Sequence, residues 1–324
     1  MKGHRAAPGV VALSLAWLLG APVCASAQAW LPPKGEMSIS LGYSYSFADE
    51  HLDYQGNVVR VPYRGNVLGM GTMAWNDADW ALSYGISDRV ALRVGVPFVV
   101  SRYEGVFPHA GLPGHANVDD GGWHGTFQDL RTEIRFRATK GSLVVTPLAA
   151  VTFPTHHYEY FAHSAAGRDL WEAQFGVNAG RLLDPWLPNA YVQARYAFAV
   201  PEKVLGIWHN RSNLTFEGGY SATSALTLSV IGDWEKTHGG WRAPLDFPAD
   251  ANILYHDQLA RSDYLRLGGG ASYALTGSID IALSAFATVY AHSETNMSGF
   301  SLGITYSFSP AQALKRKKAS RHAS

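Results

Sequence analysis

The chain has 324 residues, of which 47% are hydrophobic and 16% are charged, and its 26 lysines and arginines balance its 26 aspartates and glutamates. Its hydrophobic content excludes a disordered chain, and the lack of any apolar run of about 18 residues excludes a polytopic helical membrane protein. Two bases lie in the first 27 residues and five lie after Leu314, where there are no acids, so the rest of the chain is acidic and a poor candidate for nucleic-acid binding.

Residues 1–27 have the three parts of a secretory signal peptide. Lys2 and Arg5 precede the apolar run VVALSLAWLL, and a small-residue cleavage site ends at Ala27. The apolar run is too short for a permanent membrane helix. A lipid-attachment role for Cys24 is the alternative, although the residues before it lack the usual leucine and small residue. Cleavage after Ala27 would leave a chain without cysteine, and therefore without disulfides or a thiol nucleophile.

After this leader the hydrophobic pattern repeats every two residues, which predicts strands. Apolar and aromatic residues alternate with serine and glycine in Met37–Phe47, and the same pattern returns in Phe300–Phe308. Ten more such segments lie at about 74–85, 89–102, 126–138, 142–154, 169–181, 189–200, 211–220, 225–236, 262–274 and 278–290. Most of these segments have a length close to that of a tilted membrane strand, which needs about 9–11 residues. We therefore predict an all-β fold, a transmembrane antiparallel β-barrel of about 12 strands of the outer-membrane type.

The connections between these segments alternate in length. Short turns are expected at 86–88, 139–141, 182–188, 221–224 and 275–277, and long loops at 48–73, 103–125, 155–168, 201–210, 237–261 and 291–298. Outer-membrane barrels with both ends in the periplasm have short periplasmic turns and long outer loops. We therefore expect a signal peptide at 1–27, a periplasmic N-terminal lead at 28–35, the barrel at 36–308 and a basic periplasmic tail at 309–324.

Charged residues occupy one face of the predicted strands. Between Asp129 and Arg137 every odd-numbered residue is charged, whereas the even-numbered ones are mostly apolar. Mixed charges are costly in a dry core, so this face is expected to line a wet lumen. The same alternation gives the lumen-lining candidates Arg93, Arg131, Glu133, Arg135, Arg137, Glu172, Arg195, Glu217, Asp233, Glu235, Arg266 and Asp280, and it points Phe286 and Tyr290 inward as well. The charged residues of this set predict either a selectivity filter with acidic and basic sectors or a plugged lumen whose charges neutralise one another.

The run YGISDR from Tyr84 to Arg89, followed by a strand that ends at Pro97, carries a resemblance. It resembles the periplasmic turn of the bacterial outer-membrane β-barrel "transporter" family grouped as meta-pathway phenol degradation proteins. GTFQDL at 125–130 and FPT at 153–155 support this resemblance, which covers most of the mature chain. It implies an outer-membrane transporter and an association with aromatic catabolism.

Eleven of the 13 histidines lie in or beside the expected outer loops, several of them next to acidic residues. Imidazole together with carboxylate suits zinc or copper. No fixed-spacing ligand motif is present, so no metal site is predicted, and His156, His157 and His163 remain weak candidates. The alternative is that long polar loops collect histidines, which then order the rim through hydrogen bonds.

A catalytic set at the barrel rim is the competing enzyme hypothesis. His163 and Ser164 are adjacent, whereas a nucleophile and its base on one strand face need a spacing of i and i+2. We therefore expect no catalytic residues, no enzyme activity and no cofactor.

The sequence thus predicts an exported Gram-negative outer-membrane channel for passive uptake or export of a small solute, aromatic and hydrophobic compounds included. The alternative is a non-conducting scaffold, partner-docking or metal-sensing barrel with histidine-rich outer loops. Expected partners are outer-membrane lipid and lipopolysaccharide, and the barrel-assembly machinery, which would recognise Tyr306 and Phe308 although 16 residues follow them. The basic residues between Lys315 and Arg321 would touch anionic lipid or an acidic partner, or form a disordered end.

Overall fold

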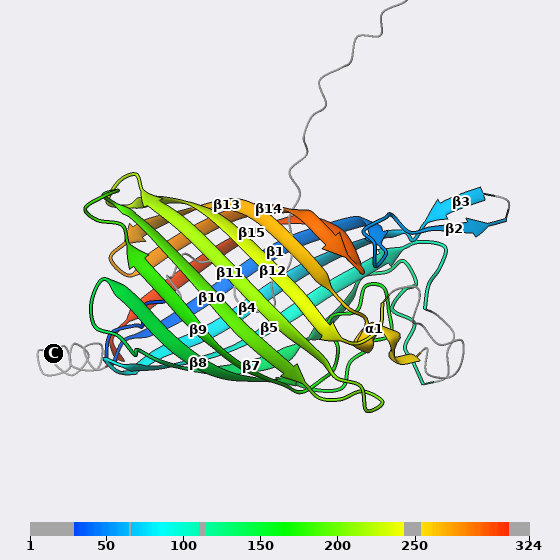
Figure 1. Cartoon of the computed structure of the whole chain (residues 1–324), viewed down its shortest axis with the longest axis horizontal. Helices are drawn as coiled ribbons and strands as arrows, with labels where there is room; N and C mark the ends of the chain where they lie inside the picture. Colours follow the sequence, from blue (N-terminus) through cyan, green and yellow to red (C-terminus); the bar gives the residue numbers. More distant parts are fainter. Residues whose placement is uncertain (1–28, 65, 110–113, 243–253, 311–324) are drawn as a thin grey trace, which may run out of the picture.

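The computed structural model describes residues 29–64, 66–109, 114–242 and 254–310 (Figure 1). The expected signal peptide and the basic residues 315–321 lie outside the described residues. The strands of the main sheet are β1 (Met37–Leu52), β4 (Thr72–Ser87), β5 (Val90–Glu104), β6 (His124–Phe127), β7 (Asp129–Phe136), β8 (Leu143–Pro154), β9 (Glu172–Leu182), β10 (Ala190–Pro201), β11 (His209–Ser221), β12 (Leu226–Gly239), β13 (Asp263–Thr276), β14 (Ile279–His292) and β15 (Glu294–Phe308). A separate hairpin joins β2 (Arg60–Tyr63) to β3 (Asn66–Gly69), and the short helix α1 covers His256–Leu259.

The main sheet closes on itself. β1 pairs with both β15 and β4, and the following strands pair with their neighbours in chain order, all antiparallel. β6 and β7 both pair with β5 and are separated only by Gln128, so they form one barrel strand. Closure leaves no unpaired strand edge, which a bilayer interior requires. Over the described ranges the barrel has twelve strands, and the predicted outer-membrane-type fold is confirmed.

Short and long connections lie at opposite ends of the barrel (Figure 1). At the end that we call the turn end, two residues join β4 to β5 and two join β13 to β14. At the other end, which we call the loop end, residues 105–123, 155–171 and 240–262 connect strands and include α1. In outer-membrane barrels the short turns face the periplasm. No helix of the described ranges is long and apolar enough to cross a membrane.

The prediction of an outer loop at residues 291–298 is wrong. Residues 291–298 lie within β14 and β15, which only Ser293 separates, at a φ of 49°. The apolar alternation fades at His292 and Glu294 although the ladder continues, because strand ends that extend beyond the hydrocarbon layer have no need of an apolar face.

The outer face of the barrel is apolar. Ile39, Leu41 and Tyr43 on β1 are 51%, 45% and 42% exposed, whereas Ser46 on the opposite face of the strand is 1% exposed. β15 repeats this arrangement, with Leu302 48% exposed. An apolar outside around a polar inside is the reverse of a water-soluble protein and is what a transmembrane barrel needs.

The residues before β1 fold into the turn end of the lumen. Ala29 is fully buried: its carbonyl accepts a hydrogen bond from Thr146 Oγ1 (2.7 Å), and its N–H donates to Gln193 Oε1 (3.2 Å). The Trp30 ring packs edge-on against Tyr191, with centroids 6.3 Å apart. A Cβ at Gly180 would lie 2.6 Å from both Ala29 Cβ and the Trp30 ring, so glycine makes room for this segment. From here on we use the name lead for residues 29–33 of the expected N-terminal segment; Ala29 and Trp30 lie inside the barrel, a placement that the strand pattern did not predict.

Candidate functional site: the lumen and its loop end

Glu133 is the centre of the first group of lumen charges. It lies on β7, is 2% exposed, and accepts hydrogen bonds from its same-face neighbours Arg131 (2.7 Å) and Arg135. Arg195 of β10 adds a bidentate pair, with Nη2 2.6 Å from Oε2 and Nη1 3.2 Å from Oε1. Because β8 and β9 separate β7 from β10 in the sheet, this pair spans the lumen instead of following the barrel wall.

Arg211 is the centre of a second group. Its guanidinium binds Glu172 of β9 and lies 3.8 Å from Glu235 of β12. All three side chains are buried. Sequence reasoning did not include Arg211 among the lumen-lining candidates, although its spacing from Asn213 and Glu217 on the same strand places it on their face.

Two further sets of contacts lie in the lumen, one between β13 and β15 and one between β10 and β11. The Arg266 guanidinium lies over the Tyr264 ring, 3.7 Å from its centroid, and 4.0 Å from Glu294. Glu217 accepts hydrogen bonds from Tyr191 and from Gln193 Nε2 (3.0 Å). The groups around Glu133 and Arg211 and the Arg266–Glu294 pair thus combine acids with bases, whereas Glu217 is bonded to uncharged side chains.

The remaining lumen-lining candidates lie beside these groups or near the turn end. Arg93 pairs in register with Glu133 across β5 and β7, and Asp233 is buried opposite Arg266 in the β12–β13 register. Arg137 follows β7, and Asp280 is exposed near the turn end of β14. The role of the whole set in lining a solute path stays a prediction.

Tyr290 does not follow the expected inward alternation. The β13–β14 register pairs Leu265 with Tyr290 but Arg266 with Thr288, so Val289 is a bulge. One extra residue reverses the faces beyond it, and Tyr290 is 45% exposed, whereas Phe286, before the bulge, packs against an inner apolar cluster.

That cluster lies near the loop end. It is formed by Ala48, Met73, Trp75, Val99, Tyr103 and Met297. The Tyr103 hydroxyl donates to Met70 O at 2.6 Å, and its ring stacks on His163, with centroids 4.5 Å apart. The apolar cluster therefore supports a group of histidines at the loop end.

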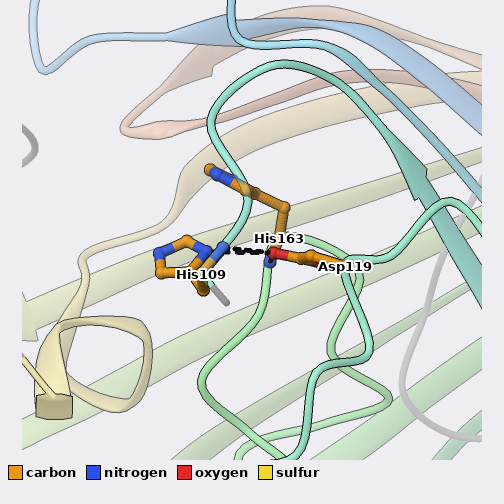
Figure 2. Close-up of side chains that lie close together, drawn as sticks. All are labelled: His109, Asp119 and His163. Carbon is orange, nitrogen blue, oxygen red and sulfur yellow. Dashed lines mark hydrogen bonds and ion pairs between the residues drawn. The ribbon is translucent and has the colours of Figure 1, made fainter. Parts of the chain in front are cut away.

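Four histidines meet there from four separate segments. His163 lies 4.1 Å from His109 and 5.3 Å from His51 between ring centroids, and His109 lies 5.0 Å from His256. We call these four residues the histidine cluster. Figure 2 shows His109 and His163 together at the carboxylate end of Asp119. Loops that fold over a barrel mouth can bring together residues that are far apart in sequence, and no spacing rule predicts which ones.

Asp119 organises the cluster. It is 5% exposed and accepts hydrogen bonds from the backbone N–H groups of His109 (3.0 Å) and His163 (3.1 Å), and His109 Nδ1 lies 3.2 Å from its Oδ2. Burial alone would raise the pKa of Asp119, but these hydrogen bonds hold it at about 2. Burial lowers the pKa of His163 to about 3, so His163 is neutral at pH 7.

The three metal candidates from sequence are not brought together. Only His163 belongs to the histidine cluster. His156 lies 2.9 Å from Thr126 Oγ1, and His157 is fully exposed beside Asp169 (3.0 Å). The ligand groups that the structure does form also use His109, His256 and Asp257, which sequence reasoning did not single out.

No catalytic relay forms around the candidate serine in the described ranges. Ser164 is buried and its hydroxyl lies 3.4 Å from Asp119 Oδ1, while His163 Nε2 donates to Phe107 O at 2.7 Å. The serine therefore contacts the acid and not a base. On the outer face Ser212 Oγ lies 2.8 Å from His238 Nε2, but Ser212 is buried and also bonds Tyr196.

Comparison with solved structures places the fold among outer-membrane barrels. An outer membrane channel from Pseudomonas putida F1 superimposes with a TM-score of 0.65 at 13% identity, over 87% of this chain and 98% of that one. The KdgM porin (TM-score 0.44, 9% identity, 83% and 99% coverage) and the translocator domain of the autotransporter NalP from Neisseria meningitidis (0.47, 10%, 85% and 90%) are more distant. No protein-family model matches the chain, and no curated protein matches it.

Proposed function

We propose that this protein is a bacterial outer-membrane channel that passes a small solute through a charged lumen. The observation that carries the proposal is the pair between Arg195 and Glu133, which crosses the inside of a closed barrel whose outer face is apolar. Charged groups inside a barrel are compatible with a hydrated path, because dry burial of so many charges would be costly. The similarity of the fold to the channel from Pseudomonas putida F1 supports the same function.

An aromatic or hydrophobic solute is the substrate class that we propose. It rests on the YGISDR turn and its resemblance to the meta-pathway phenol degradation group. Tyr191 and Trp30 near the turn end, and Tyr264 beneath Arg266, supply aromatic faces beside the charged groups. Such faces can stack on an aromatic ring.

A non-conducting scaffold is the second candidate function, and a specific observation favours it. The lead occupies part of the turn end, and the histidine cluster with its supporting loops lies over the loop end. A barrel obstructed at both ends would not conduct.

Single-channel recording of the purified mature protein in planar bilayers separates the two. We expect a small, stable conductance with a preference for either cations or anions. The conductance should fall when phenol or benzoate is added. Absence of conductance at every polarity and salt concentration, in a preparation shown to be folded, would contradict the channel and favour the scaffold.

A further inference from the structure

We infer that the loop end contains a binding site for a divalent transition-metal ion, formed by His109 Nε2, His256 Nε2 and the carboxylate of Asp257. His109 comes from the β5–β6 connection, and the other two residues come from α1, between β12 and β13. These connections leave the barrel wall on opposite sides. A bound ion would therefore tie together two loops across the loop end.

The three ligand atoms converge closely enough for one ion. The two Nε2 atoms are 3.1 Å apart, His256 Nε2 is 3.0 Å from Asp257 Oδ1, and His109 Nε2 is 3.7 Å from Asp257 Oδ2. For a tetrahedral ion with metal–nitrogen distances of about 2.0–2.1 Å, two ligand nitrogens lie roughly 3.3 Å apart. The separations between the two Nε2 atoms and between His256 Nε2 and Asp257 Oδ1 are close to this value, and the carboxylate offers one oxygen toward each histidine.

The contacts of His109 suit a metal ligand. Asp119 Oδ2 lies 3.2 Å from His109 Nδ1, and the other ring nitrogen, Nε2, faces His256 and Asp257. A carboxylate that holds the far nitrogen of a ligand histidine is the usual outer-shell arrangement at protein metal sites. Backbone N–H groups hold Asp119 in turn.

An unsatisfied polar atom provides a second, independent observation. Asp257 Oδ2 is buried and has no hydrogen-bond partner among the described residues, although it lies 3.7 Å from His109 Nε2. A buried carboxylate oxygen without a partner is unfavourable, and a cation at this point would remove that cost.

A second position on the same histidine is the alternative. His109, Asp119 and His163 also have ligand atoms within 4.8 Å of one another. At that position Asp119 would have to exchange its hydrogen bonds from His109 and His163 for metal contacts. The position at His256 requires no such exchange, so we assign the site there.

Two imidazoles and one carboxylate select the metal class. This donor set suits Zn²⁺, Co²⁺, Ni²⁺ and Cu²⁺, whereas Mg²⁺ and Ca²⁺ prefer sites made of oxygen ligands. Side chains of the three ligands are only 12% to 23% exposed, so the site lies within the loops and not on their surface.

Calorimetry on the EDTA-treated full-length mature protein in detergent, titrated with Zn²⁺, tests the site, and titration with Co²⁺ followed by visible absorption reports the ligand geometry. We expect one equivalent of each ion to bind, with the intense absorption of tetrahedral Co²⁺. His256→Ala and Asp257→Asn should each weaken binding at least tenfold, and Asp119→Asn about 10- to 100-fold without changing the stoichiometry. His157→Ala, which replaces a fully exposed histidine outside the cluster, is the matched control and should bind as the wild type does.

Two results would overturn the assignment. One is the absence of saturable Zn²⁺ or Co²⁺ binding in protein whose gel mobility changes on heating, as that of folded barrels does. The other is loss of binding in His163→Ala with unchanged binding in His256→Ala, which would place the ion at Asp119. Neither readout depends on conductance, so failure of the channel function and failure of the metal site are distinguished.

Discussion

Arg195 on β10 and Glu133 on β7 form a bidentate ion pair across the lumen, with two strands of the barrel between them on the nearer side. Glu133 also binds Arg131 and Arg135, so one carboxylate serves three guanidinium groups. This arrangement connects two strands that are not neighbours in the wall and gives the group around Glu133 a net positive charge. It therefore contributes both to barrel stability and to the charge that a permeating solute meets.

Substitution of Glu133 should cost more stability than substitution of Arg195. Glu133→Gln leaves three guanidinium groups facing one another and is expected to lower the free energy of unfolding by about 3 kcal/mol. Arg195→Met leaves Glu133 with Arg131 and Arg135 and should cost about 1 kcal/mol. Urea titration of the protein in lipid vesicles, followed by tryptophan fluorescence, measures both.

Lys140→Met, at the exposed β7–β8 turn, is the control for the loss of one charge and should be neutral. Equal effects of the Glu133 and Arg195 substitutions on the free energy of unfolding would mean that water in the lumen screens these charges. The pair would then not stabilise the barrel wall.

The apolar outer face predicts strong sensitivity to charge. Leu302 lies at mid-strand on β15 and is 48% exposed. Leu302→Arg places a guanidinium against the hydrocarbon layer and should destabilise the folded barrel in bilayers by about 2–4 kcal/mol. Val67→Arg is the matched control: Val67 is 63% exposed on β3, outside the barrel wall, and should tolerate the change. Equal tolerance at both positions, measured by folding yield into vesicles, would contradict a lipid-facing β15.

The strands and the direction in which their side chains point could be predicted because one face of the sheet contacts lipid and the other contacts water. Lipid outside and water inside impose a period of two, which is why the alternation from Asp129 to Arg137 places Glu133 inward and Ile134 outward at 49% exposure. The prediction is wrong at Tyr290, where a bulge at Val289 shifts the period, and for the outer loop expected at 291–298, where both flanking strands extend beyond the hydrocarbon layer.

The candidate sites could be predicted only in part. Arg211 follows the same alternation as the other lumen charges, so its inward position could have been predicted from the sequence. The histidine cluster was not, because His109 and His256 are 147 positions apart and meet only through loop conformation. The lead was missed for a similar reason: Ala29 and Trp30 carry no strand pattern, and their place depends on space beside Gly180.

The pair between the exposed His157 and the largely buried Asp169 should be detectable by titration. The hydrogen bond to Asp169 and the negative charge beside it raise the pKa of His157 above its ordinary value of 6.5. The raised pKa means that the pair is fully formed below pH 6.5 and is lost as the pH rises through the folded-state pKa. NMR titration of the His157 ring should give a midpoint above 6.5, and Asp169→Asn should return it toward 6.5. If the titration midpoint of His157 were the same in Asp169→Asn as in the wild type, the ion pair would not form in solution.

The lead should restrict the lumen at the turn end. It is held there by hydrogen bonds of Ala29 with Thr146 and Gln193 and by the contact of Trp30 with Tyr191. Deletion of residues 29–33 should therefore raise single-channel conductance roughly twofold or more. Gly180→Val should do the same, since a side chain there would occupy the place of Ala29 and Trp30. Lys34→Ala, beside the lead but exposed, is the control. Unchanged conductance in both variants would mean that solute passes the lead freely, whereas conductance that appears only after deletion would identify the lead as a plug.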